Sequence, residues 1–140
     1  MADAETHVAF VCIQNAGRSQ MATAFAERER EARGLMGVAI HTGGTDPADN
    51  VHDVVRDAMA DVGIELEREP RAISDDTLAS CDVVATMGCS TLGLAADTDV
   101  RDWDLPDPHG RDLETVRDIR EDVSGRVTAL FDELEAQEGE

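Results

Sequence analysis

A short apolar run that leads through a polar turn into a helical pattern constrains the fold of this chain most strongly. Residues 7–12 read HVAFVC, which has the length and composition of a buried parallel strand. The polar turn at residues 14–17 contains a glycine, and residues 19–33 then place apolar side chains on one helical face until Gly34 ends the pattern. The chain therefore begins with a strand, a turn and a helix in direct succession.

The rest of the chain continues to alternate strand-like and helix-like segments. We expect strands at residues 38–40, 82–87 and 98–101, a helix at residues 50–62, and a longer helix whose apolar stripe runs from residue 113 to residue 134. A bend at Ser124-Gly125 is the alternative to a straight last helix. Alternating strands and helices predict an α/β fold: one domain over residues 1–140, with a four-stranded parallel sheet and flanking helices.

The charge of the chain is extreme. Asp and Glu number 31 against 12 basic residues, all of them Arg, and the formal net charge is -19. Such a surface repels nucleic acid and anionic membranes, so neither is expected as a partner. The acidic residues are spread along the whole chain, which favours a surface adapted to a high-salt cytoplasm over an acidic patch for one basic partner.

The sequence carries no signal that would direct it out of the cytoplasm. No apolar run approaches the ~20 residues that span a bilayer. The acidic first residues lack the basic and apolar stretches of a secretion signal. A cytoplasmic location is therefore expected.

Three cysteines, Cys12, Cys81 and Cys89, are the next informative residues. An odd number in an intracellular chain argues against a disulfide framework, and their spacing does not match the paired ligands of a zinc site. The four histidines are scattered singly, so no metal is expected. The cysteines are therefore either chemically active or buried as small apolar side chains.

The segment from Cys12 to Ser19 is suited to hold an anion. Cys12 ends the first strand, five residues follow, and Arg18 opens the helix. Main-chain N–H groups of those five residues can surround one tetrahedral oxyanion, and the helix end and the guanidinium of Arg18 add positive charge there. The five residues are Ile13, Gln14, Asn15, Ala16 and Gly17.

The same positive field would activate Cys12. It stabilises the thiolate, so the sulfur becomes a nucleophile at neutral pH. Ser19 can donate a hydrogen bond to this sulfur as it leaves an adduct, and Asn15 suits a left-handed position in the middle of the loop. The alternative is a buried cysteine with an exposed Arg18, which the surrounding strand, polar turn and Ser-opened helix disfavour.

These residues resemble a known family. The stretch VCIQNAGRSQMATAF at residues 11–25 is similar to the active-site loop of the low-molecular-weight tyrosine phosphatase superfamily, and within it to the arsenate reductases. Residues 41–48 (HTGGTDPA), 82–89 (DVVATMGC) and 102–110 (DWDLPDPHG) resemble further segments of the family in the same order. The resemblance implies the low-molecular-weight tyrosine phosphatase-like fold and an enzyme that reduces arsenate to arsenite.

Two departures from the phosphatase pattern favour the reductases. The phosphatases usually carry a second cysteine before the arginine and a proline after the serine, whereas Gly17 and Gln20 stand at these positions. They also commonly follow the Asp-Pro pair with aromatic residues that line a phenol pocket, whereas His109-Gly110 stands here in a chain with 3% aromatic residues and no Tyr. A bare oxyanion needs no such pocket.

The resemblance also implies roles for individual residues. Asp107, in an Asp-Pro pair, would be the general acid that protonates the departing oxygen, with Asp104 as the less favoured choice. Cys89 would be the resolving thiol that attacks the Cys12 adduct, with a bystander role as the alternative. Cys81 precedes the strand that Cys89 follows, about 20 Å away, and is expected to be a buried hydrophobe.

The electron donor is expected to be external. The thioredoxin-coupled members of the family carry a further cysteine shortly after the position of Cys89, and residues 90–93 contain none. The expected donors are a small thiol or a thioredoxin- or glutaredoxin-like protein, with no bound cofactor. Because arsenate and phosphate are similar anions, a phosphatase of phosphotyrosine or another phosphomonoester is the first alternative, and a non-catalytic oxyanion-binding module is the second.

Overall fold

The structure alternates strands and helices along the chain. The computed structural model describes residues 6–12, 15–35, 37–44, 46–66, 69–87, 99–103, 105–106, 108 and 110–138. Its elements are β1 (Thr6–Cys12), α1 (Arg18–Arg33), β2 (Val38–Gly44), α2 (Asp53–Ala60), α3 (Asp75–Ala79), β3 (Val83–Met87), β4 (Asp99–Asp102) and α4 (Leu113–Glu138).

The described strands form one four-stranded parallel sheet in the order β2-β1-β3-β4. The predicted fold class is therefore confirmed. β1 lies inside the sheet, where its last five residues are buried, as its apolar sequence requires. Cys12, at its carboxyl end, pairs with Gly44 of β2 and Met87 of β3. Parallel α/β sheets bind ligands at this edge, so Cys12 is placed where a ligand is expected.

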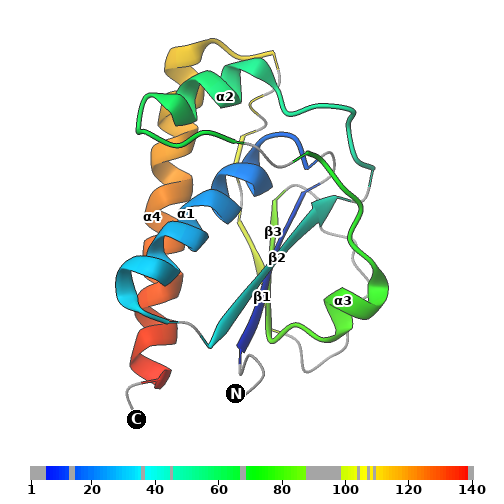
Figure 1. Ribbon diagram of the computed structural model, residues 1–140. Coiled ribbons are helices and arrows are strands. Elements are labelled where there is room, and N and C mark those ends of the chain that lie inside the picture. Colours follow the sequence, from blue (N-terminus) through cyan, green and yellow to red (C-terminus); the bar gives the residue numbers. More distant parts are fainter. Residues whose placement is uncertain are drawn as a thin grey trace.

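Alternate residues of β1 point to opposite faces of the sheet. Phe10 and Cys12 belong to a large apolar core that includes residues of α1, α2 and α4. Val11 packs on the other face with Leu78 of α3. Figure 1 shows this layering, with α1 and α4 on one side of the sheet and α3 on the other. The amino end of α1 lies at the carboxyl ends of the strands, close to Cys12.

Two element boundaries near this edge differ from the sequence expectation. β2 continues to Gly44 rather than ending at residue 40, because residues 42–44 extend its pairing with β1. The two glycines at positions 43 and 44 fit a strand that another segment approaches closely. α2 begins at Asp53, with His52 as its N-cap residue, and not at residue 50 as expected.

The segment at residues 71–73 runs along the end of β2. The N–H of Gly44 donates to the carbonyl of Arg71 at 2.8 Å, and Gly44 forms a parallel bridge with Ala72. A Cβ atom on Gly43 would lie 2.5 Å from Cβ of Ile73, which is too close for any side chain at position 43. This close approach brings the main chain of Arg71 to the carboxyl edge of the sheet.

The later elements follow the sequence expectation more closely. α3 was not expected, because its five residues are too few to show a helical period. β3 and β4 lie within one residue of their expected bounds. α4 continues without interruption through Ser124-Gly125, so it is one helix. In the ranges given above, no helix is both long and apolar enough to cross a membrane.

Candidate active site

The Cys12 sulfur has polar partners although the side chain is only 3% exposed. Its Sγ lies 2.8 Å from Oγ of Ser19, and the main-chain N–H of Asn15 donates to it at 3.1 Å. Both partners come from the turn and the first helical turn after β1, where the positive end of α1 adds to the field. An ionised sulfur can accept both hydrogen bonds, so these surroundings suit a thiolate.

Asn15 organises the loop between Cys12 and Ser19, which we call the oxyanion loop (residues 12–19). Its φ of 51° is the only positive value of a non-glycine residue in the described chain, as expected for this position. Its Nδ2 donates to Oγ of Ser19 at 2.7 Å and to Oγ1 of Thr42 at 3.0 Å, while its Oδ1 accepts from the N–H of Arg71 at 3.1 Å. Asn15 thus joins the loop to the helix, to β2 and to the segment beside β2.

Arg18, the first residue of α1, is 9% exposed and does not extend into solvent. Its Nη1 donates to the main-chain carbonyl of Leu105 at 2.9 Å. Within the part of the chain that the structure describes, this bond uses one of the five N–H groups of the guanidinium, and the others could bind an anion. It also ties the oxyanion loop to the proline-containing loop that follows β4.

Pro108 of that second loop lies directly against the oxyanion loop. A Cβ atom on Gly17 would come within 2.7 Å of Cγ of Pro108 and 3.6 Å of Cδ2 of His52. Position 17 therefore has no room for a side chain unless Pro108 moves. The contact places Pro108 next to the loop that would bind the anion.

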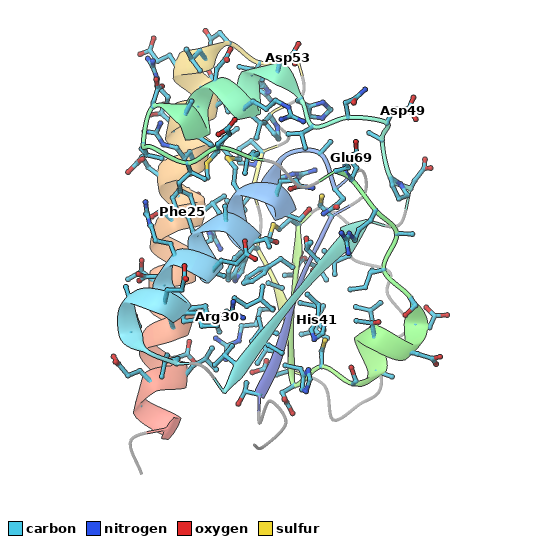
Figure 2. The ribbon with its side chains drawn as sticks, viewed as in Figure 1. Phe25, Arg30, His41, Asp49, Asp53 and Glu69 are labelled. Carbon is cyan, nitrogen blue, oxygen red and sulfur yellow. The ribbon has the colours of Figure 1, made fainter. Side chains whose placement is uncertain are left out.

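An acidic rim borders the oxyanion loop on the side of α2. The N–H of His52 donates to the carbonyl of Ala16 at 3.0 Å, and His52 lines a shallow depression with residues 48–53 and Arg56. Figure 2 shows Asp49 and Asp53 near the end of the molecule where α2 begins. Both carboxylates are exposed to solvent.

Cys81 lies at the opposite end of the sheet from Cys12. The register pairs Cys12 with Met87 and Val8 with Val83, so Cys81 lies beyond the amino end of β3. Its Sγ donates to the carbonyl of Thr77 at 3.2 Å. Burial raises the pKa of the Cys81 thiol, and the charge of Asp82 adds to this effect. The expectation of a buried, unreactive thiol fits this position.

Four residues with predicted roles lie outside the described residues. They are Ile13, Gln14, Cys89 and Asp107. Asp104 and His109 also lie outside them. The acid role of Asp107 and the resolving role of Cys89 therefore stay predictions. Among the described residues, no group of three or more His, Cys, Asp or Glu side chains is arranged to hold a metal ion.

Three contributors to the site were not singled out for it from the sequence. Thr42 accepts from Asn15 and itself donates to the carbonyl of Phe10 at 3.0 Å, which depends on the β1–β2 register. Gln20 reaches back to Asn15 from α1. Arg71 contacts the site through its main-chain N–H, which donates to Oδ1 of Asn15.

The fold and the loop geometry agree with a comparison of the whole sequence. The family described as low molecular weight phosphotyrosine protein phosphatase matches residues 7–139. The chain belongs to this family.

Three relatives carry the name of an arsenate reductase. A Halobacterium salinarum protein named "Putative arsenate reductase" is 61% identical over 136 residues, which cover 95% of this chain and 96% of the relative. The glutaredoxin arsenate reductase of Synechocystis sp. is 32% identical, covering 89% of this chain and 95% of the relative. The solved structure of a Corynebacterium glutamicum thioredoxin-dependent arsenate reductase superposes with a TM-score of 0.81 at 27% identity. That match covers 98% of this chain and spans 65% of the length of the Corynebacterium chain.

Proposed function

We propose that this protein is a thiol-dependent arsenate reductase in which Cys12 is the nucleophile. The observation that carries the proposal is the polar setting of the buried Cys12 sulfur, 2.8 Å from Ser19 Oγ and 3.1 Å from the Asn15 N–H. Such a sulfur can be held ionised next to an oxyanion. The 61% identity to a relative named for arsenate reduction supports the choice of oxyanion.

The first step joins arsenate to the protein. Arsenate binds to the main-chain N–H groups of the oxyanion loop and to the guanidinium of Arg18. The Cys12 thiolate attacks arsenic, a sulfur–arsenic bond forms, and one arsenic–oxygen bond breaks. Asp107 supplies a proton so that the departing oxygen leaves as water. The packing of Pro108 on Gly17 supports this role because Pro108 follows Asp107 directly in the sequence.

The second step transfers the electrons. A second thiolate attacks the Cys12 sulfur, a disulfide forms, and the sulfur–arsenic bond breaks. Its electron pair stays on arsenic, which leaves as arsenite. Two thiols are thereby oxidised to one disulfide while As(V) is reduced to As(III). Cys89 is the proposed second thiol.

An external thiol then restores the enzyme. Two of the relatives are named for glutaredoxin and for thioredoxin, which supports a protein dithiol or a small thiol as the reductant. A cytoplasmic location suits this cycle, because the cytosol keeps thiols reduced. No bound cofactor is needed, since the thiols carry both electrons.

A coupled assay with single-cysteine variants tests this proposal. Purified protein in high salt receives arsenate with a small thiol, a thioredoxin system or a glutaredoxin system, and arsenite is measured. Cys12→Ser should give no arsenite, while Cys81→Ser, the matched control, should keep the parent rate. Cys89→Ser should form no disulfide after arsenate is added. Turnover of Cys89→Ser at the parent rate would remove Cys89 from the mechanism, and turnover of Cys12→Ser would overturn the proposal.

Phosphomonoester hydrolysis is the second candidate, because the family as a whole is described by its phosphatase activity. The aromatic residues argue against a phenolic substrate. The chain has three Phe, one Trp and no Tyr. All four aromatic side chains are buried, and Trp103 packs against Phe10 in the core. None is left to line a phenol pocket, so release of phenol from an aryl phosphate should be slow beside arsenate reduction.

A further inference from the structure

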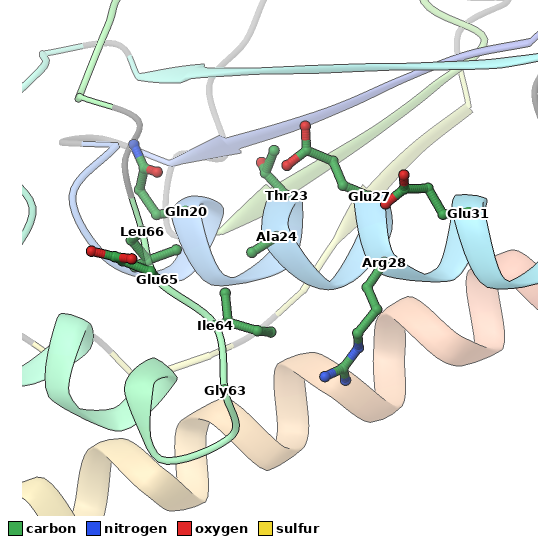
Figure 3. A pocket seen from close by; sticks show the side chains of 10 residues that line it. All are labelled: Gln20, Thr23, Ala24, Glu27, Arg28, Glu31, Gly63, Ile64, Glu65 and Leu66. Carbon is green, nitrogen blue, oxygen red and sulfur yellow. The ribbon is translucent and has the colours of Figure 1, made fainter.

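The Gln20 side chain is buried at the start of α1 and has no part in the chemistry described so far. It is only 2% exposed. Figure 3 shows it on the first turn of α1, at one end of a groove between α1 and residues 63–66. Burying a carboxamide is costly unless it is hydrogen-bonded, so the hydrogen-bond partners of Gln20 indicate its structural role.

Both described partners of Gln20 belong to Asn15. Nε2 of Gln20 lies 3.0 Å from the main-chain carbonyl oxygen of Asn15 and 3.3 Å from its Oδ1. One carboxamide thus holds the main chain and the side chain of the same residue. Asn15 is also the residue with the left-handed conformation, whose N–H donates to the Cys12 sulfur.

The bond to the main-chain carbonyl fixes the orientation of a peptide plane. In a trans peptide the carbonyl of one residue and the N–H of the next point in opposite directions. Because Gln20 holds the Asn15 carbonyl, the N–H of Ala16 points away from Gln20. The N–H of His52 holds the Ala16 carbonyl in the same manner at 3.0 Å, so the N–H of Gly17 also points away from its support.

These two N–H groups could donate to a ligand. No described residue accepts a hydrogen bond from the N–H of Ala16 or of Gly17. They follow the N–H of Asn15, which already points at the Cys12 sulfur. Three consecutive N–H groups on one loop form a concave anion site, provided that the outward carbonyls are held.

We propose that Gln20 is a positioning residue that orients the Ala16 N–H toward the bound oxyanion by holding Asn15 at two oxygens. The inference rests on the oxyanion site of the proposed function, but not on arsenate being its substrate. Inorganic phosphate can therefore serve as the probe.

Gln20→Met tests this role because it removes the Nε2 donor at nearly constant side-chain volume. Phosphate affinity would be measured by the protection of Cys12 against alkylation, in high salt at pH 7. Loss of the hydrogen bonds from Gln20 to Asn15 should weaken phosphate binding about tenfold, which is the effect of one net hydrogen bond. In turnover, the KM for arsenate should rise more than kcat falls, because the N–H contacts substrate and transition state alike.

Gln20→Glu supplies a readout that a merely structural role would not give. An ionised Glu at position 20 faces the Asn15 carbonyl with an acceptor, whereas a protonated Glu can donate to it. Burial favours the protonated form, so it should be reached at mildly acidic pH. The affinity of Gln20→Glu relative to the parent should therefore recover as pH falls, while that of Gln20→Met should not.

Arg30→Met is the matched control on the same helix. It removes a bond from Arg30 to the carbonyl of Val38 and touches no residue of the oxyanion loop. Its phosphate affinity should equal that of the parent. The proposal is overturned if Gln20→Met binds phosphate as tightly as the parent, if Arg30→Met weakens binding equally, or if the Glu variant shows no recovery. If the parent itself binds no phosphate, the oxyanion site fails as well.

Discussion

Replacing Asn15 by Ala removes four hydrogen bonds from the base of the oxyanion loop. The lost partners are Ser19 Oγ at 2.7 Å, Thr42 Oγ1 at 3.0 Å, the Arg71 N–H at 3.1 Å and Gln20 Nε2 at 3.3 Å. At about 1 kcal/mol net for each bond, the loss is about 4 kcal/mol. The left-handed conformation that Asn15 adopts at φ 51° also costs an alanine about 1 kcal/mol of conformational free energy.

A loss of this size is a large part of the roughly 5–15 kcal/mol that stabilises a typical domain. Urea unfolding in molar KCl, followed by circular dichroism, would measure it as a lower midpoint at unchanged slope. Asn15→Gly is the matched control, because it loses the same bonds but tolerates positive φ. It should be about 1 kcal/mol more stable than Asn15→Ala. A loss below about 1 kcal/mol for Asn15→Ala would refute the view that this network holds the loop.

Three further predictions concern charge, protonation and packing. With a net charge of -19, the protein should melt at a clearly lower temperature in dilute buffer than in molar KCl, as screening of self-repulsion requires, and an unchanged melting temperature would contradict this. Burial, and secondarily the charge of His7, lower the pKa of His41 from its ordinary 6.5, and its ring nitrogen lies 3.0 Å from that of His7. The unfolded chain therefore binds the proton more tightly than the folded chain. As a result, the contribution of the neutral His41 to the free energy of unfolding is complete above about pH 6.5 and declines as pH falls below it. The midpoint of urea unfolding should therefore fall less between pH 8 and pH 5 in His41→Gln than in the parent. An equal fall in both proteins would exclude His41 as the cause. Gly17→Ala would place a Cβ atom 2.7 Å from Pro108 Cγ, so it should lower kcat for arsenate by displacing Pro108 from the oxyanion loop. An equal kcat would contradict the packing argument.

The sequence carried enough local information to predict the centre of the fold. The run HVAFVC and the turn before the helix at Arg18 each depend on neighbours in the chain, and both appear in the structure as expected. The parallel sheet followed from the alternation of elements, which is also a local pattern.

The parts that were not predicted depend on distant partners. β2 continues through Gly43 because this residue pairs with β1, and Ile73 approaches it closely. No local pattern records either contact. Thr42 meets Asn15 only through the β1–β2 register. The buried role of Gln20 depends on the path of a loop, whereas its place in the sequence reads as an ordinary helical residue.

The central claim is that Cys12 is an ionised nucleophile at an oxyanion site, and the chain supplies its own reference thiol in Cys81. The direct measurement is the rate at which iodoacetamide labels each cysteine at pH 6.5, read by peptide mass spectrometry with and without phosphate. Cys12 should be labelled much faster than Cys81, whose pKa is raised by burial, and phosphate should protect Cys12 alone. Labelling of Cys12 no faster than Cys81, with no effect of phosphate, would contradict the account.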